Sequence, residues 1–272
     1  MKKEFVFNNG VISPALAYGT WLIKNEDAEE CVLNAIEVGY RHIDTAQAYG
    51  NEEGVGNAIK KCGMPREQLF VTSKIKAEIK DYETAKKSID ESLRKLQLDY
   101  IDLMLIHCPT PWSEYGSKYR YFKENLEVWK ALTEAYENGK IRSIGVSNFE
   151  QEDIDNILNN SDVKPVANQI CVHIGHTPIE LIKYCQNKNI VIESYSPVAH
   201  GNIINNPIIK DLADKYRVSP AQLCIRYTLQ LDTISIPKAQ NKSHMIENTK
   251  LDFEISDEDM KSLLSIQGLT SF

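Results

Sequence analysis

The sequence contains no apolar run that approaches the roughly 18 residues needed to span a bilayer. Two lysines follow Met1, but no apolar segment follows them, so we expect no secretory signal peptide. The six cysteines are scattered and none forms a C-x-x-C pair, which is typical of reduced thiols in the cytosol. These absences predict a cytoplasmic protein with no membrane partner.

Glycine and proline are also scarce, with 13 and 10 residues in a chain of 272, which excludes collagen-like and Pro/Gly-rich disordered chains. Basic residues are outnumbered, 31 against 38 acidic residues, and the net charge is -7. This balance lacks the positive surface that announces nucleic-acid binding. The longest basic cluster, Lys86-Lys87, is too short for a polybasic membrane patch. We therefore expect no nucleic acid partner.

The hydrophobic share of 42% is that of a folded globular protein. Short Val/Ile/Leu-rich runs alternate with longer amphipathic segments, and no linker divides them. The expected strands are residues 17–19, 42–44, 69–73, 101–106, 141–146, 167–172, 190–194 and 234–236. The expected helices lie near residues 26–38, 51–61, 84–96, 125–138, 151–159, 178–187, 207–216 and 219–230.

Eight strands, each followed by a helix, predict an α/β fold in which a (β/α)8 TIM barrel closes on itself. We expect residues 1–272 to form this single barrel domain. Residues 5–12 carry an Asn-Gly turn between apolar residues, which predicts an N-terminal β-hairpin capping the barrel bottom. The rival is a doubly wound open sheet. Its glycine fingerprint is missing, because Gly54-x-Gly56 follows no strand and Ile59 occupies the third glycine position.

Reactive side chains follow several expected strands, and in a barrel the C-terminal strand ends meet around one axis. Asp44, Lys74, His107 and the pair Ser147-Asn148 stand at four of these ends, and Tyr49 is within loop reach of Asp44. A tyrosine is a poor acid at neutral pH, but a nearby ammonium lowers its pKa. Such a set suits protonation of an oxyanion that develops on a carbonyl group. It holds no hydride of its own, so reduction would require a nicotinamide cofactor.

Several motifs resemble those of the aldo-keto reductase family. The longest is GYRHIDTAQAYGNE at residues 39–52. The others follow in the family's order: LMLIH at 103–107, GVSNF at 145–149, NQ at 168–169, YSP at 195–197, IPK at 236–238 and EN at 247–248. The resemblance extends from residue 19 to residue 259, and its specificity comes from the number and order of the motifs.

The resemblance implies a barrel that binds NADP(H), with NADH as a possible second cofactor, and that reduces an aldehyde or ketone. It implies that Tyr49 is the general acid, tuned by Lys74, and that Asp44 pairs with Lys74. His107 is implied to orient the carbonyl, and the substrate pocket is implied to include Trp21, Tyr49, His107 and Cys108. The implied cofactor contacts are Ser147, Asn148 and Gln169 on the carboxamide, Tyr195 on the ring, Lys238 at the 2′-phosphate, Glu247 and Asn248 at the adenine, and also Thr20, Ser196, Val198, Ala239 and His244.

Three departures from the family pattern bear on the pocket and the cofactor. Cys108 stands where relatives often carry Trp, Ala239 where Ser is usual, and His244 where Arg often grips the 2′-phosphate. A neutral His244 would hold a phosphate less tightly than an arginine. We therefore expect NADPH to be preferred over NADH by a narrower margin than in an Arg-bearing relative.

Two alternatives remain open at this point. Cys171-x-His173-x-x-His176 has zinc-ligand residue types, although no carboxylate or further histidine is near in sequence, and we expect no metal. The chain could also be a non-catalytic sensor that keeps the fold and the cofactor, but the intact catalytic set argues against this. The physiological carbonyl substrate is not predicted by the sequence. The family default is a monomer.

Overall fold

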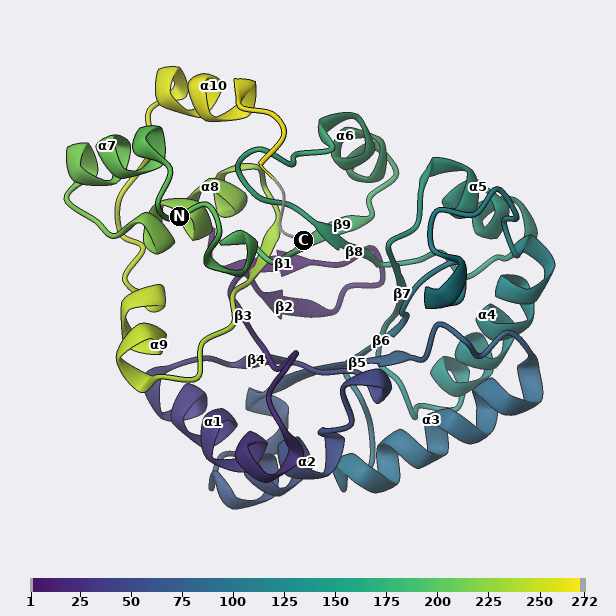
Figure 1. Ribbon diagram of the computed structural model, residues 1–272. Helices are drawn as coiled ribbons and strands as arrows, with labels where there is room; N and C mark the ends of the chain where they lie inside the picture. Colours follow the sequence, from purple (N-terminus) through teal and green to yellow (C-terminus); the bar gives the residue numbers. More distant parts are fainter. Residues whose placement is uncertain (1, 270–272) are drawn as a thin grey trace.

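Eight parallel strands pair in chain order and form the barrel of the computed structural model, which describes residues 2–269 (Figure 1). The barrel closes where Leu16 bridges to Ser235 and where the Gly19 N–H donates to the Pro237 carbonyl at 3.0 Å. This is the predicted (β/α)8 architecture. The strands are β3 (Ala17–Gly19), β4 (His42–Asp44), β5 (Phe70–Ile75), β6 (Leu103–Ile106), β7 (Ile144–Ser147), β8 (Ala167–Cys171), β9 (Val191–Tyr195) and β10 (Ile234–Ile236).

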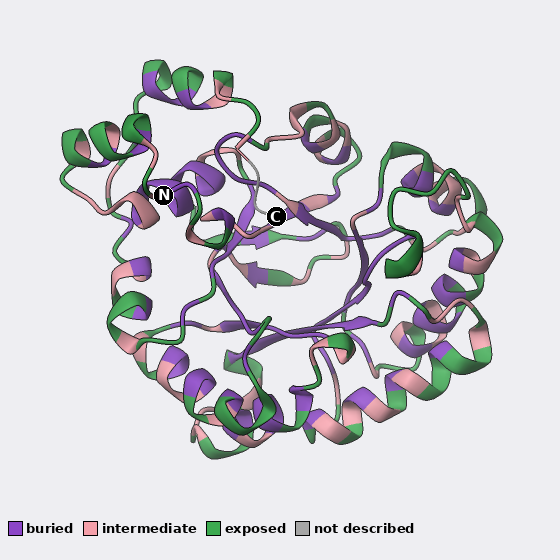
Figure 2. Cartoon of the chain, in the orientation of Figure 1, coloured by how far each residue is buried: buried purple, intermediate pink, exposed green. Residues whose placement is uncertain are grey.

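The helices surround the strands, and each turns its apolar face inward (Figure 2). None of those within residues 2–269 is long and apolar enough to cross a membrane. Their bounds are α1 (Asn25–Val38), α2 (Glu52–Lys61), α3 (Tyr82–Leu96), α4 (Phe122–Glu137), α5 (Gln151–Asn160), α6 (Ile179–Asn187), α7 (Pro207–Tyr216), α8 (Pro220–Gln230), α9 (Lys242–Thr249) and α10 (Asp257–Ser265).

The order of helices differs from the expectation of one helix after each strand. Two helices, α7 and α8, lie between β9 and β10, at the positions expected from residues 207–216 and 219–230, and β10 is followed by α9, which the sequence analysis did not predict. It also missed α10. Both helices begin at side-chain caps, since Asn241 accepts from the Ser243 N–H and Ser256 accepts from the Asp259 N–H.

Each barrel strand is buried on both faces, which explains its nearly continuous apolar sequence. In β6, all four residues from Leu103 to Ile106 have no exposed surface. Leu103 and Leu105 belong to the apolar cluster that includes Ile234 and Ile236 of β10. Met104 and Ile106 belong to the cluster between the strands and the surrounding helices. The alternation places one side of every strand inside the barrel, where the polar residues described below gather.

The predicted hairpin is present and closes the bottom of the barrel. It consists of β1 (Glu4–Val6) and β2 (Ile12–Pro14), which pair antiparallel. In its turn, the Asn8 Nδ2 donates to the carbonyls of Pro165 and Asn189, at 2.9 and 3.2 Å. The Asn9 Nδ2 donates to the Arg142 carbonyl at 3.0 Å. Those three acceptors precede β8, β9 and β7, so the hairpin caps the N-terminal ends of the strands and leaves the opposite mouth open.

Gly54 and Gly56, which a dinucleotide fingerprint would place in a phosphate loop, lie inside α2 and serve helix packing. A Cβ on Gly54 would come within 2.5 Å of the Asn25 carbonyl oxygen, and one on Gly56 would come within 2.5 Å of the Leu96 carbonyl oxygen. The two glycines therefore allow α2 to approach α1 and the end of α3 closely. The rival reading of an open doubly wound sheet is wrong.

Candidate active site

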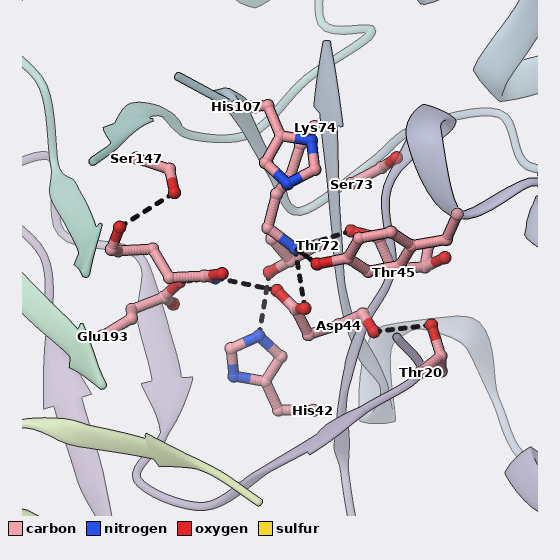
Figure 3. Close-up of polar contacts among 12 residues, drawn as sticks. Thr20, His42, Asp44, Thr45, Thr72, Ser73, Lys74, His107, Ser147 and Glu193 are labelled. Atoms are coloured by element: carbon pink, nitrogen blue, oxygen red, sulfur yellow. Dashed lines mark hydrogen bonds and ion pairs between the residues drawn. The ribbon is translucent and has the colours of Figure 1, made fainter. Parts of the chain in front are cut away.

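A buried ion pair lies at the C-terminal end of β4 and β5. Asp44 is the last residue of β4, and Lys74 lies within β5, one residue before its end. The Lys74 Nζ is 2.7 Å from Asp44 Oδ1 and donates to the Thr45 carbonyl at 2.8 Å (Figure 3). Lys74 has no exposed surface, and Asp44 is 3% exposed. The structure thus brings together the two residues that the sequence predicted to pair.

Tyr49 ends a short 3-10 helix, η1 (Gln47–Tyr49), in the loop after β4. Gly50 stops that helix in the left-handed conformation, with φ of 69°, and so turns the chain away after Tyr49. The Tyr49 hydroxyl lies 3.4 Å from Lys74 Nζ, and its ring is half-buried. Lys74 therefore donates to both Asp44 and Tyr49 from the floor of the site.

The electrostatics of Tyr49 differ from the sequence expectation. Burial raises the pKa of Tyr49, and this outweighs the lowering by Lys74, so the phenol stays protonated at neutral pH. Burial opposes the charge of Lys74, but attraction to Asp44 and Tyr49 more than compensates and raises the pKa of Lys74. The resting site therefore holds a protonated phenol beside a permanent ammonium.

His107 follows β6 and faces the same point. Its ring centroid is 5.6 Å from that of Tyr49, and the side chain is 7% exposed. Burial, together with the charge of Lys74, lowers the pKa of His107 to about 3, so the imidazole is neutral at physiological pH. Its Nδ1 is buried and has no hydrogen-bond partner among the described residues. Trp112, from the loop after β6, packs edge-on against the His107 ring at 5.2 Å.

Beside His107, the ends of β7 and β9 are joined by side chains. The Asn148 Nδ2 donates to the His107 carbonyl at 3.0 Å, and the Tyr195 hydroxyl donates to Asn148 Oδ1 at 2.8 Å. Ser147 donates to the Gln169 carbonyl at 2.8 Å. Asn148 and Ser196 have φ of 59° and 53°, a conformation that is uncommon for residues other than glycine and that gathers at functional sites.

Gln169 lies deeper than its implied role suggests. Its Nε2 donates to Asp44 Oδ2 and to Glu193 Oε2, each at 2.8 Å. Both amide hydrogens are therefore taken by carboxylates, so Gln169 can meet a nicotinamide carboxamide only through its oxygen.

The residues implied to hold the adenosine end lie at and after the end of β10, and they differ in exposure. Lys238 and His244 are exposed, and Glu247 is half-buried. Ala239 is largely buried, and its carbonyl accepts from the Tyr18 hydroxyl at 2.5 Å. Asn248 is also buried and hydrogen-bonds to Tyr40.

The remaining implied residues also fall into two groups. Trp21 is 38% exposed, and its ring lies 5.1 Å from that of His200. Val198 is half-buried. Thr20 is fully buried, and its hydroxyl donates to the Asp44 carbonyl at 2.9 Å. Cys108 has no exposed surface, so it presents no surface to a substrate, in contrast to the expectation that it lines the pocket.

Three side chains at the site were missed or given no role by sequence reasoning. Glu193 lies inside the barrel, and the only signal for it was an acidic residue within an apolar strand. Trp112 was given no role. Lys80 donates to the Cys108 carbonyl at 3.0 Å and to Asn125 Oδ1 at 2.9 Å, which fixes the start of the loop that carries Trp112.

The zinc alternative has no support in the geometry. The His173 Nδ1 pairs with the Ile174 carbonyl at 2.9 Å, and the His173 and His176 rings lie 5.5 Å apart. Within residues 2–269, no three His, Cys, Asp or Glu side chains are grouped so that they could hold a metal ion. The two histidines instead flank a tight turn in which their backbone groups bond to each other.

Comparison with known proteins places these observations in a family. A model described as the aldo/keto reductase family matches residues 15–267. A glyoxal reductase of Bacillus subtilis is 40% identical over 97% of this chain and 92% of its own length. A methylglyoxal reductase of Escherichia coli is 37% identical over 95% of this chain and 91% of its own length.

Solved structures agree. An aldo/keto reductase from Brucella melitensis matches with a TM-score of 0.90 and 37% identity, covering 97% of this chain and 99% of that one. An aldo-keto reductase from Bombyx mori in complex with NADP matches with a TM-score of 0.87 and 36% identity, covering 97% and 92%. These matches span nearly the whole sequence, and the chain therefore belongs to the aldo/keto reductase family of NAD(P)H-dependent oxidoreductases.

Proposed function

We propose that the chain reduces the carbonyl group of small aldehydes and ketones to an alcohol with NADPH, and that Tyr49 is the general acid. One observation carries this proposal. The Tyr49 hydroxyl lies 3.4 Å from a fully buried ammonium, Lys74 Nζ, which is itself held 2.7 Å from Asp44 Oδ1. A protonated phenol beside a fixed cation is suited to give up a proton as negative charge develops on a carbonyl oxygen.

NADPH, when bound, supplies the hydride. Tyr49 donates its proton to the carbonyl oxygen, and Lys74 stabilises the phenolate that remains. Asp44 keeps Lys74 in place, and both are dry, so their interaction is not screened by solvent.

His107 acts as a neutral hydrogen-bond donor in this proposal. Its low pKa excludes an imidazolium at neutral pH, so only one ring nitrogen carries a proton. A buried donor without an acceptor is costly, and Nδ1 has no partner, so we assign the proton to Nε2. That N–H would bind the carbonyl oxygen beside Tyr49 and fix its orientation.

The residues at the mouth fit a phosphorylated dinucleotide. Lys238 is an exposed cation after β10, and α9 begins four residues later at its Asn241 cap, where the positive end of the helix dipole favours anions. Ser147, Asn148 and Tyr195 form a hydrogen-bonded surface beside His107, which would hold the nicotinamide carboxamide and ring. We propose that these residues bind NADP(H) and that NADH binds more weakly.

The wall beside His107 is aromatic. Trp112 packs on the His107 ring and remains 39% exposed, so it offers an apolar wall next to the reacting atoms. Trp21 offers a second exposed indole. Glyoxal and methylglyoxal reductases are among the relatives, so we propose that short aldehydes carrying a second carbonyl are substrates.

The test is a panel of methylglyoxal, simple aldehydes, ketones and quinones, assayed against NADPH and NADH. We expect turnover of short aldehydes, faster with NADPH, and loss of turnover in Tyr49→Phe. Dissociation constants for NADPH should change little in that variant. NADPH binding without turnover of any carbonyl would favour the non-catalytic sensor instead.

We also infer that residues 1–272 form one domain that works as a monomer in the cytoplasm. The four proposed catalytic side chains come from one chain. None of the six cysteines, all within the described residues, forms a disulfide. Sedimentation at micromolar concentration tests the monomer, and a dimer there would overturn it.

A further inference from the structure

The interior of the barrel holds a second acidic residue that the proposed reaction does not use. Glu193 lies in the middle of β9 and has no exposed surface. Its Oε2 accepts from Gln169 Nε2 at 2.8 Å, and the same nitrogen donates to Asp44 Oδ2 at 2.8 Å. Glu193 and Asp44, the two acceptors, are labelled in Figure 3. One amide group therefore joins Glu193 to the Asp44–Lys74 pair.

The charges around Glu193 do not balance when it is ionised. Asp44 on β4, Lys74 on β5 and Gln169 on β8 act on it, and His42 on β4 lies in the same part of the barrel interior, bonded to Thr72. Burial lowers the pKa of His42 to about 3, so His42 is neutral, and Lys74 is the one cation of this group. Lys74 already binds Asp44. An ionised Glu193 would therefore leave the cluster with a net charge of about −1 in a dry interior.

Two observations agree with this imbalance. Glu193 Oε1 is buried and has no hydrogen-bond partner among the described residues, which is unfavourable for a carboxylate. Burial, with repulsion from Asp44, raises the pKa of Glu193 to about 7. Glu193 thus changes its charge near neutral pH.

We propose that Glu193 is a pH-responsive positioning residue, which holds Asp44 through Gln169 and, when ionised, adds a negative charge that opposes proton donation by Tyr49. The inference rests on the proposed role of Tyr49. Negative charge develops on the carbonyl oxygen and on the phenol during that step, so a further negative charge nearby disfavours it. A protonated Glu193 removes this penalty while its neutral carboxyl still accepts from Gln169.

The activity test compares the wild type with Glu193→Gln, which keeps the shape and removes the charge. We measure kcat/KM for methylglyoxal at saturating NADPH between about pH 5.5 and pH 9. The kcat/KM of the wild type should fall by about threefold or more as pH rises through neutral, because ionised Glu193 adds a negative charge close to the site. In Glu193→Gln this decline should vanish or move upward by about one pH unit.

Glu52→Gln is the matched control. Glu52 is also buried, accepts from Ser73 Oγ at 2.7 Å and has its pKa raised by burial, but it lies on α2 outside the barrel. It should leave the pH profile of kcat/KM as in the wild type. Should Glu193→Gln fail to fold, Glu193→Met gives the same neutral position and the same expected profile.

Thermal unfolding supplies a readout that does not need catalysis. The folded state retains the Glu193 proton up to about pH 7, whereas the unfolded chain releases it near the ordinary value. The folded state then binds more protons, so Glu193 destabilises the protein progressively as pH rises through this window. The Tm of Glu193→Gln relative to wild type should therefore be higher at pH 8 than at pH 5 by about 5 °C.

The pH profile of kcat/KM and the Tm difference together distinguish a failure of the proposed function from a failure of the role assigned to Glu193. If wild type reduces no carbonyl, but the Tm difference depends on pH as expected, the proposed function fails and the ionisation of Glu193 stands. If the wild type is active and the pH profile of kcat/KM is the same in Glu193→Gln as in the wild type, the positioning role of Glu193 is overturned. A Tm difference that is the same at both pH values would overturn the ionisation itself.

Discussion

The buried Lys74–Asp44 pair allows a prediction that separates stability from catalysis. Lys74→Met keeps most of the length of the side chain and removes its charge, so the Asp44 carboxylate loses its counter-ion in an interior where it is 3% exposed. Gln169 still donates to Asp44 Oδ2, which leaves the carboxylate one hydrogen bond from a side chain that carries no charge. A charge left unpaired in this way is far less stable than either a paired charge or no charge.

The expected cost follows from this burial. Breaking one side of a buried ion pair destabilises a protein by about 3–5 kcal/mol, and we take the lower end because Gln169 remains. For a chain of this size, about 3 kcal/mol lowers Tm by about 6–12 °C. Adding Asp44→Asn to Lys74→Met removes the unpaired charge, so the double variant should recover about 2 kcal/mol. Activity should be lost equally in both.

The assay is a double-mutant cycle of thermal unfolding at one scan rate, with carbonyl reduction measured on the same four proteins. Lys86→Met is the control, because Lys86 and Glu134 form a pair that is 45% and 38% exposed. That pair should contribute less than about 1 kcal/mol. Wild-type stability in Lys74→Met, or a double variant less stable than the single one, would refute the view that Lys74 compensates a buried carboxylate.

Three further predictions concern the reaction. Tyr49→Phe should lower turnover by at least about 100-fold and change Tm little, since Lys74 keeps Asp44; near wild-type turnover in an NADPH oxidation assay would remove Tyr49 from the mechanism. His107→Ala should lower kcat by about 100-fold or more. The wild-type imidazole is neutral above about pH 3, so a pH profile of kcat that requires a protonated His107 near neutral pH would contradict its assignment as a neutral donor. His244→Arg should widen the ratio of NADH to NADPH dissociation constants by about 10-fold or more; an unchanged ratio would show that the exposed His244 does not meet the phosphate.

The framework of the fold was predictable because its strands are short, apolar and well separated. Residues 17–19, 42–44 and 234–236 are strands with the expected bounds, and α7 also matches its range. The missed helices α9 and α10 are short, with eight and nine residues, and bury few side chains, so apolar periodicity is weak in them. The caps Asn241 and Ser256 were the available signals.

The candidate site was predictable to the extent that it lies at strand ends. Asp44, Lys74 and His107 converge because parallel strands end at one mouth. Glu193 was not predictable in the same way, because its role depends on which side of β9 faces the barrel axis. Cys108 was assigned to the pocket from its place in a motif, but the chain turns there and buries it. Loop geometry of this kind depends on contacts such as those of Lys80 and is not encoded in local spacing.

The closure of the barrel has a consequence for how the chain folds. Leu16 pairs with Ser235, so the last seam of the sheet joins residues more than 200 positions apart, whereas every other seam joins consecutive strands. A ribosome must release nearly the whole chain before β10 can meet β3. Until then β3 presents an open parallel edge, which is a template for pairing with another chain. Because distant contacts form slowly, we expect this seam to form late and the nascent chain to depend on it for protection against aggregation.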